Sequence, residues 1–385
     1  MNNNERLYRK LGLYIEEYSH RNKSNEDIPV YSVTNSKGFC KEFFNKEVAS
    51  QDKSTYKIVP RGCFAYNPSR VNVGSIAWQN EEDRVIVSPL YNIFKVSDEL
   101  DNDYLLYYLK TNSTIAYIDA ISRGTVRSNL RMSALNEFVI PYYAIDKQLS
   151  IVGELNAISE SISLLQSQVS DLDVLTQAIF LDMFGDPLIN PKHFDSIYLK
   201  DCSEFKNGIN FSKNEDGNEY KFLGVSDFGD KYTIKECELS SIHLKDALDE
   251  EYYLKENDIV FVRSNGSKSM IGRSVMIQDI ISPTTYSGFC IRCRLVKNTI
   301  IPIYLLYLLK TDAIVNHITS SGRGCNINNL NQKILGEIPV MIPDLPLQEI
   351  FARKISSIEE AKTSLNSQIA EMQTLLAARM QYWFE

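Results

Sequence analysis

The sequence predicts an α+β protein in which two globular units are each followed by a long helix. A stretch that occurs twice, 200 positions apart, indicates the duplication. Short β-branched and aromatic runs broken by turn residues indicate strands, and two long segments with apolar residues every three or four positions indicate helices. The chain is therefore expected to hold two tandem units of mixed structure.

The repeat is clearest in "YLLYYLKT" at 104–111 and "YLLYLLKT" at 304–311. It continues without change of offset, so that "SRGTVRSNL" at 122–130 lies over "GRGCNINNL" at 322–330. Later positions also match, including Gln148 with Gln348 and Phe184 with Phe384. Solenoid repeats have periods of roughly 20 to 50 residues, so this longer period predicts a tandem pair of whole domains, each with its appendage.

The appendages are predicted to be long helices with coiled-coil periodicity, because their apolar residues alternate by four and three. In the second helix Lys362 is the one polar interruption of this stripe. The first helix is acidic and the second carries a small positive excess, which favours pairing between them. We expect an antiparallel, pseudo-twofold pair, with packing of each helix on its own domain as the alternative. The candidate pairing residues are Ile151, Leu155, Ile158, Ile162 and Leu165 in the first helix, and Ile355, Ile358, Leu365 and Ile369 in the second.

The expected domain boundaries follow from these elements. The first globular unit is placed at 1–145, its helix at 146–184, the second unit at 185–344 and its helix at 345–385. Gly185 and the prolines that follow it are expected to end the first long helix. Asp101 or Asn102 is expected to cap the repeated short helix.

Composition excludes several classes of protein. The 385 residues carry a formal net charge of −8, which argues against indiscriminate nucleic-acid binding. No stretch of about 18 apolar residues predicts a membrane span. Seven scattered cysteines form no disulfide framework and indicate a reducing cytoplasm.

Motifs for catalysis are missing. The sequence has no phosphate-binding glycine loop of the G-x-x-x-x-G-K-S/T kind and no glycine-rich methyl-donor loop after a strand. Asn67-Pro68-Ser69-Arg70 is interpreted as a turn, and Cys290 and Cys293 should point to opposite faces of a strand. The four histidines are isolated in the sequence, so we predict no catalytic and no metal site.

Basic residues gather just before the repeated helix in each unit, at 53–80 and at 261–297. The loop "VRSNGSKSMIGR" at 262–273 combines cations for phosphate with Asn and Arg, which can contact base edges. "SRGTVRSNLR" and "SGRGCNINNL" supply a second loop in each unit. A solvated basic turn is the simpler explanation for any one loop, but matched pairs in an acidic chain favour DNA. The candidate DNA-binding residues are Arg61, Asn67, Arg70, Arg123, Arg127, Arg263, Asn265, Lys268, Arg273, Arg323 and Asn326. Among them Asn67 and Arg70 are taken as the counterparts of the 263–273 group.

The order of these pieces resembles the specificity subunit of type I restriction-modification systems. The resemblance covers the whole chain and rests on "NDIVFVRSNGSKSMIGR", "YSGFCIRCRL", "YLLYLLKT", the "SGRG…NL" loop, "IPDLPLQEIFARKI" and "MFGDP…NP". The first unit departs from the second in "FAYNPSRVNVGS" and in "IPYYAIDKQLSI", which lacks the second proline. Such differences in the loops are what two domains reading different sequences would need.

The resemblance implies two target-recognition domains that each read half of a split target in double-stranded DNA. It implies two copies of an adenine methyltransferase subunit as partners, and a restriction or translocase subunit where the system has one. S-adenosylmethionine would then lie in the methyltransferase, and ATP and Mg in the restriction subunit, with no cofactor in this chain. The resemblance further suggests base and phosphate contacts for Arg263, Asn265, Lys268 and Arg273, and phosphate contacts for Arg123, Arg127, Arg323 and Asn326.

Two other functions remain open. A non-catalytic coiled-coil scaffold could use its basic loops to bind an acidic protein, and would show no salt-dependent DNA binding. A DNA-modifying enzyme would bind a methyl donor by itself.

Overall fold

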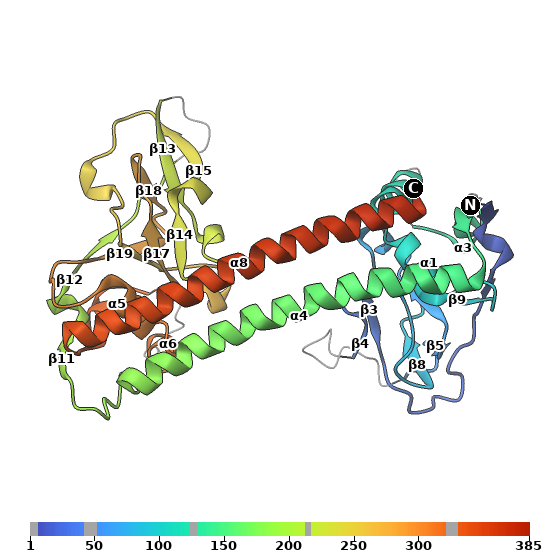
Figure 1. The fold of residues 1–385 in the computed structure, drawn as a ribbon, viewed down its shortest axis with the longest axis horizontal. Coiled ribbons are helices and arrows are strands. Elements are labelled where there is room, and N and C mark those ends of the chain that lie inside the picture. Colours follow the sequence, from blue (N-terminus) through green and yellow to red (C-terminus); the bar gives the residue numbers. More distant parts are fainter. Residues whose placement is uncertain (1–6, 42–51, 123–128, 212–216, 321–329) are drawn as a thin grey trace. The chain divides into compact units, whose positions relative to one another are not determined.

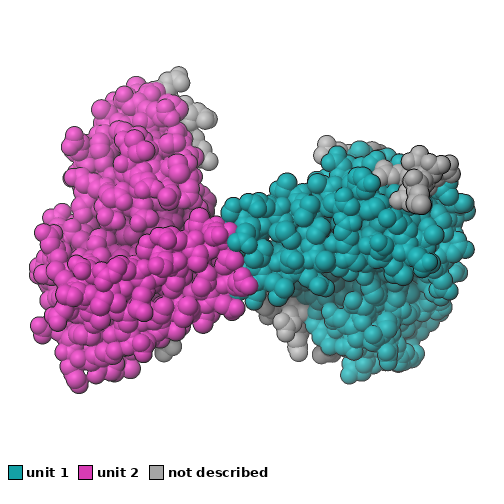
Figure 2. All heavy atoms as spheres, in the orientation of Figure 1, with its two compact units in different colours: residues 1–167, 366–385 teal, residues 168–365 magenta. Residues whose placement is uncertain are grey.

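The computed structural model describes residues 7–41, 52–122, 129–211, 217–320 and 330–385. The chain divides into two compact units, residues 1–167 with 366–385 (unit 1) and residues 168–365 (unit 2) (Figure 2). Each unit therefore combines one globular part with one portion of each long helix. The domain boundaries expected from the sequence cut the chain before and after the helices instead, and they remain a prediction.

Unit 1 contains short strands, three short helices and the first part of a long helix (Figure 1). The strands are β1 (Leu7–Lys10), β2 (Ile15–Glu17), β3 (Ser32–Thr34), β4 (Gly38–Cys40), β5 (Lys57–Pro60), β6 (Phe64–Tyr66), β7 (Ile76–Trp78), β8 (Arg84–Val87), β9 (Asn92–Val96) and β10 (Val139–Tyr142). The helices are α1 (Asn102–Leu109), α2 (Asn112–Ser122), α3 (Met132–Asn136) and α4 (Ile145–Phe184), whose last part belongs to unit 2.

Unit 2 repeats this order of elements with longer strands. Its strands are β11 (Asp195–Tyr198), β12 (Ser203–Asn207), β13 (Asn218–Leu223), β14 (Thr233–Lys235), β15 (Ser240–Leu244), β16 (Ile259–Val262), β17 (Ser274–Gln278), β18 (Thr284–Tyr286), β19 (Cys290–Leu295) and β20 (Pro339–Ile342). Its helices are α5 (Pro302–Leu309), α6 (Asp312–Ser320), α7 (Gln332–Gly336) and α8 (Leu345–Phe384), which ends in unit 1.

The two units share one sheet framework. In unit 1 the central sheet has the order β2-β9-β6-β7, and in unit 2 the order is β12-β19-β16-β17 with β14 added at the edge. Each unit also has a separate antiparallel pair that joins its first strand to its last strand. These pairs are β1 with β10 and β11 with β20. The remaining strands differ, since unit 1 has the pairs β3-β4 and β5-β8 whereas unit 2 has the sheet β15-β13-β18. The predicted tandem α+β fold is therefore confirmed.

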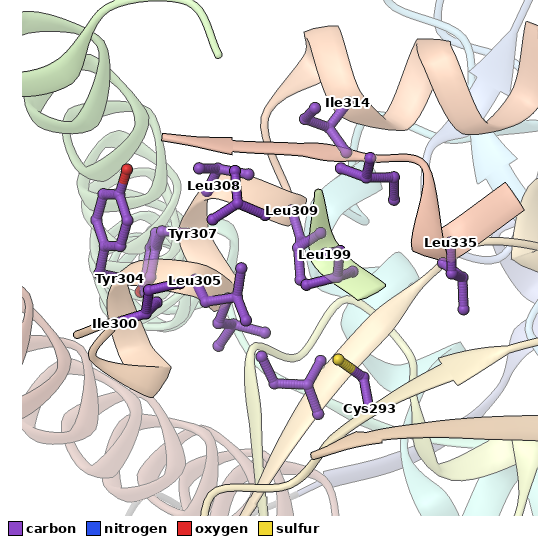
Figure 3. Packing of buried hydrophobic residues seen from close by; sticks show 14 of the residues in the cluster. Leu199, Cys293, Ile300, Tyr304, Leu305, Tyr307, Leu308, Leu309, Ile314 and Leu335 are labelled. Carbon is purple, nitrogen blue, oxygen red and sulfur yellow. The ribbon is translucent and has the colours of Figure 1, made fainter. Parts of the chain in front are cut away.

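The repeated motif forms α1 and α5, which lie in the core of each unit. Asp101 caps α1, because its side chain accepts a hydrogen bond of 2.9 Å from the backbone nitrogen of Tyr104. The hydroxyl of Tyr104 donates to the carbonyl of Pro141 at 2.7 Å, and that of Tyr304 donates to the carbonyl of Met341 at 3.1 Å. Figure 3 shows Tyr304, Leu305 and their neighbours on α5 gathered with Leu199, Cys293 and Leu335. The motif recurs because each copy anchors a long helix to its own sheet.

A buried glutamine fixes the start of each long helix. Gln148 donates to the carbonyls of Glu99 and Tyr143 at 3.0 and 2.8 Å, while its Oε1 accepts from the backbone nitrogen of Asp101 at 2.9 Å. Gln348 makes the same three contacts with Thr299, Pro343 and Ile301. Both side chains are fully buried, so all three hydrogen bonds lie away from water.

The first long helix ends where the sequence predicts. Gly185 has a φ of 81° and donates its backbone N–H to the carbonyl of Leu181 at 2.8 Å. A Cβ at this position would lie 2.4 Å from Cγ of Pro191, so both the conformation and the space require glycine.

Within each unit, α4 and α8 lie side by side and run in opposite directions. In unit 1 Arg379 forms a two-point ion pair with Glu154, and the indole of Trp383 donates to the same carboxylate at 3.2 Å. In unit 2 Lys362 meets Asp173 at 2.7 Å. Earlier α4 residues thus contact later α8 residues, and the predicted antiparallel pairing is confirmed.

The predicted pairing residues occupy two environments. Ile151 and Leu155 are fully buried in a cluster that contains α1 as well as Trp383 and Phe384 from α8. The start of α4 therefore packs on the globular part of unit 1 and on the end of α8 at once. Ile158, Ile355, Ile358 and Ile369 are also buried, whereas Ile162, Leu165 and Leu365 are half-buried.

Candidate nucleic-acid interface

The basic loops predicted from the sequence connect equivalent strands in the two units. In unit 1 the loop runs from β6 to β7, and in unit 2 from β16 to β17. Both return to the sheet through a glycine in the left-handed region, Gly74 with φ of 81° and Gly272 with φ of 84°. A Cβ on Gly74 would lie 2.4 Å from Oδ1 of Asn35, so a larger residue there would require the Asn35 side chain to move.

A matched backbone hydrogen bond joins these loops to the end of the second predicted loop. The nitrogen of Leu130 donates to the carbonyl of Pro68 at 3.1 Å, and the nitrogen of Leu330 donates to the carbonyl of Arg263 at 2.8 Å. In unit 1 the hydroxyl of Ser69 also donates to Oδ1 of Asn129 at 2.6 Å. By this bond the backbone counterpart of Arg263 is Pro68, which lies between Asn67 and Arg70, the two residues taken as counterparts of the 263–273 group.

In unit 1 the predicted residues differ in how free they are to reach a ligand. Arg70 is exposed, and its guanidinium has no partner among the described residues. Oδ1 of Asn67 accepts from the backbone nitrogen of Ser69 at 3.0 Å, which holds the predicted turn. The guanidinium of Arg61 donates to the carbonyls of Asn80 and Glu81 at 3.0 and 3.1 Å. Arg61 thus stabilises a local turn.

In unit 2 Arg263 is half-buried, and no side-chain partner is found for it within the described ranges. Asn265 is exposed and accepts from the backbone nitrogen of Ser267 at 3.2 Å. Arg273 is bound internally, since it donates to the carbonyls of Ser269 and Gly229 and forms a 2.8 Å ion pair with Asp230. Arg263 is therefore the freer of the two arginines.

Five predicted side chains cannot be placed. The backbone of Lys268 lies in a short 3-10 turn, Lys268–Met270, but its side chain is outside the described part of the chain. Arg123, Arg127, Arg323 and Asn326 lie outside the described residues altogether. Arg131 follows Leu130 and was not among the predicted residues. Its side chain is exposed and has no partner among the described residues.

The basic stretch of unit 2 is less available than its sequence indicates. Arg292 is buried and donates to the carbonyls of Glu251 and Tyr253 at 2.8 and 3.2 Å. Arg294 pairs with the buried carboxylate of Asp258 at 2.7 Å, and this hydrogen bond raises the pKa of Arg294. Both guanidinium groups are bound within unit 2, so only part of the stretch can serve an electrostatic interface.

The two cysteines of the C-x-x-C sequence are buried. Cys290 and Cys293 belong to core clusters on opposite sides of β19, as their spacing predicts. Burial raises the pKa of each thiol to about 12, which disfavours the nucleophilic thiolate. Within the described ranges no three His, Cys, Asp or Glu side chains gather as a metal site, and no helix there is long and apolar enough to span a bilayer.

Two loops on a repeated α+β framework, followed by paired long helices, define a two-domain recognition protein. The family model for the type I restriction modification DNA specificity domain matches twice, at residues 14–171 and 191–372. The chain belongs to this family and carries two copies of its domain. The family is one of specificity domains, in agreement with the prediction of a non-catalytic subunit.

Individual relatives agree with the family match. The chain is 30% identical over 132 residues to the type I restriction enzyme StySPI specificity subunit of Salmonella potsdam, and 28% identical over 132 residues to the EcoKI specificity subunit of Escherichia coli (strain K12). Each match spans 34% of this chain and 28% of the relative.

A solved structure resembles the fold over most of the chain. A chain from a structure described as the basis of complex assembly and conformational transition of the type I R-M system covers 97% of this chain and 96% of its own length. Its TM-score is 0.60 at 16% sequence identity. This likeness supports the fold.

Proposed function

We propose that the chain is the DNA-binding specificity subunit of a type I restriction-modification complex. Each globular part reads one half of a bipartite target in double-stranded DNA. The chain directs an adenine methyltransferase to that target, and a restriction subunit where one is present.

The observation that carries this proposal is a shared framework with different loops. The central sheets have the same strand order, and Leu130 and Leu330 make matched contacts with Pro68 and Arg263. The side chains displayed by the loops differ, with Ser69 and Arg70 in one unit and Arg263 and Asn265 in the other. Two domains that hold DNA in the same way but read different base edges need this combination.

Two matched surfaces on the long helices support two copies of the partner. Leu175 on α4 and Leu375 on α8 occupy equivalent positions of the repeat and are 46% and 43% exposed. Because the repeat presents each helix position twice, a partner that binds one long helix has an equivalent contact on the other. One methyltransferase subunit would therefore bind beside each unit.

No cofactor is assigned to this chain under the proposal. S-adenosylmethionine would be held by the methyltransferase, and ATP and Mg by the restriction subunit. Under this proposal the specificity subunit places its partners at the DNA target, and the partners carry out the chemistry.

Methyl transfer tests the proposal. The chain is purified alone and together with its methyltransferase subunit, and each preparation is assayed for methyl-donor binding, salt-dependent DNA binding and adenine methylation. The pair should methylate a split target, and the chain alone should neither bind the donor nor methylate.

Methylation by a preparation proven free of the partner would identify an enzyme instead. A pair that shows no salt-dependent DNA binding would support the scaffold alternative.

A further inference from the structure

Unit 1 carries an open groove between the end of α1 and the last turns of α8. Its volume is about 590 Å³, and its lining includes Lys110, Thr111, Gln373, Leu376, Ala377 and Met380. Lys110 forms one rim, where its Nζ donates to the carbonyl of Asn35 at 3.3 Å. The groove lies on the helices, and none of the loop residues considered above lines it.

The equivalent place in unit 2 is filled by Tyr232. Its ring stacks on Tyr307 with 4.6 Å between ring centroids, and the Nζ of Lys310 lies 4.3 Å from the centroid of the Tyr232 ring. Lys310 also donates to the carbonyl of Lys231, directly before the tyrosine, at 2.9 Å. A hydrogen bond with Gln177 and the nearby Asp173 act on the same hydroxyl, whose pKa is raised mainly by burial.

Three residues around Tyr232 are repeat counterparts of residues that line the groove. Lys310 corresponds to Lys110, Asp173 to Gln373 and Gln177 to Ala377, all at the offset of 200 positions. In unit 1 the chain passes Lys110 with "TNSKG" at 34–38, which offers a carbonyl from Asn35 but no aromatic ring. Ala377 is shorter than Gln177, which leaves additional space.

We propose that this groove is a binding site for a tyrosine side chain of a partner protein, seated as Tyr232 is in unit 2. The ring would lie against α8 beside the Lys110 ammonium, and the carbonyl before it would accept a hydrogen bond from Lys110. An aromatic ring buried next to a cation gains both apolar area and cation–π attraction. Such aromatic anchors often dominate protein–protein interfaces. Burial also lowers the pKa of Lys110.

The test uses N-acetyl-L-tyrosine N-methylamide, whose acetyl carbonyl stands in for the carbonyl before the tyrosine. Binding to the full chain is followed by ligand-observed NMR, with N-acetyl-L-alanine N-methylamide and p-cresol as comparison probes. The tyrosine probe should bind at one site per chain, the alanine probe should not bind, and p-cresol should bind more weakly because it lacks the carbonyl.

Two substitutions on α8 locate the site. Ala377→Leu fills the groove and should weaken binding at least about tenfold, or about 1.4 kcal/mol. Ala370→Leu places the same side chain on an exposed position of the helix outside the groove and should leave binding unchanged. Tyr232→Ala opens the second copy and should raise the number of sites from one to two.

Several results would overturn the proposal. They are no binding of the tyrosine probe, equal binding of p-cresol, or binding that Ala377→Leu leaves intact. If Tyr232→Ala fails to fold, the Ala377→Leu and Ala370→Leu variants and the three probes still decide the outcome.

Discussion

Lys362 of α8 and Asp173 of α4 form an ion pair of 2.7 Å in which the lysine side chain is only 14% exposed. Lys362 also bonds Glu359 at 3.0 Å, so the polar residue that interrupts the apolar stripe has two carboxylate partners. The repeat counterparts of this pair are Ile162 and Gln373, and those of Glu154 and Arg379 are Lys354 and Ile179. Neither ion pair can form between two copies of one helix, and both therefore favour pairing of α4 with α8.

Replacement of this lysine should weaken the helix pair. Lys362→Met removes hydrogen bonds to two carboxylates, and we expect the free energy of unfolding to fall by about 1 to 3 kcal/mol. Lys354→Met, on an exposed turn of the same helix, should change it by no more than about 0.5 kcal/mol. Denaturant unfolding compares the two variants. Equal losses would show that the ion pair does not stabilise the pairing.

The contact of Glu154 with Arg379 should make unit 1 sensitive to acid. The hydrogen bonds from Arg379 lower the pKa of Glu154. Because the carboxylate has a lower pKa when folded, its contribution is fully present above the unfolded pKa of about 4.3 and is lost as the pH falls through the folded value.

Thermal unfolding of Glu154→Gln and wild type across this acidic range measures the effect. The variant should be less stable near neutral pH, and the difference should shrink as the pH decreases. A difference that stays constant with pH would contradict the assignment.

The buried glutamines should be essential to the start of each long helix. Gln148→Leu leaves the nitrogen of Asp101 and the carbonyls of Glu99 and Tyr143 without their partner, and each buried unpaired group costs about 1 to 3 kcal/mol. Gln166→Leu, on an exposed face of α4, serves as the control. Equal unfolding free energies for Gln148→Leu and Gln166→Leu would contradict this, because they would show that the three backbone groups lose nothing without Gln148.

Local signals allowed much of the fold to be predicted. The cap at Asp101, the stop at Gly185 and the apolar stripe of both long helices each depend on residues within a few positions of one another. The repeat then extended each inference from one unit to the other.

The partners of the basic residues could not be predicted, because they depend on strand register and loop packing. Arg294 meets Asp258 through adjacent strands, 36 positions apart, and Arg273 meets Asp230 across 43 positions. The contact of Tyr232 with Lys310 also depends on loop packing, so it could not be predicted from the sequence. A count of charges along the chain therefore overestimated the free basic surface of unit 2.

The two arginines of the 262–273 loop should separate binding from stability. Arg263→Ala should weaken DNA binding by the assembled complex by about 1 to 3 kcal/mol if the side chain contacts a base. Arg273→Ala should mainly destabilise unit 2, since its guanidinium is bound to Asp230 and to the carbonyl of Gly229. Affinity titrations on one target, with a thermal melt of each variant, measure both effects. Unchanged affinity of the Arg263 variant would rule out its loop as a contact.

The central claim is that the paired helices set the distance between the two half-sites. One heptad inserted into both helices, between Gln168 and Leu172 and between Gln368 and Met372, adds about 10 Å of helix. At roughly 3.4 Å per base pair along each strand, the unread spacer should lengthen by about three base pairs while the two defined blocks stay the same.

Methylation mapping in cells that express this variant with its methyltransferase subunit makes the measurement. A lengthened spacer between unchanged blocks is the predicted result, and an unchanged spacer or altered blocks would contradict the account.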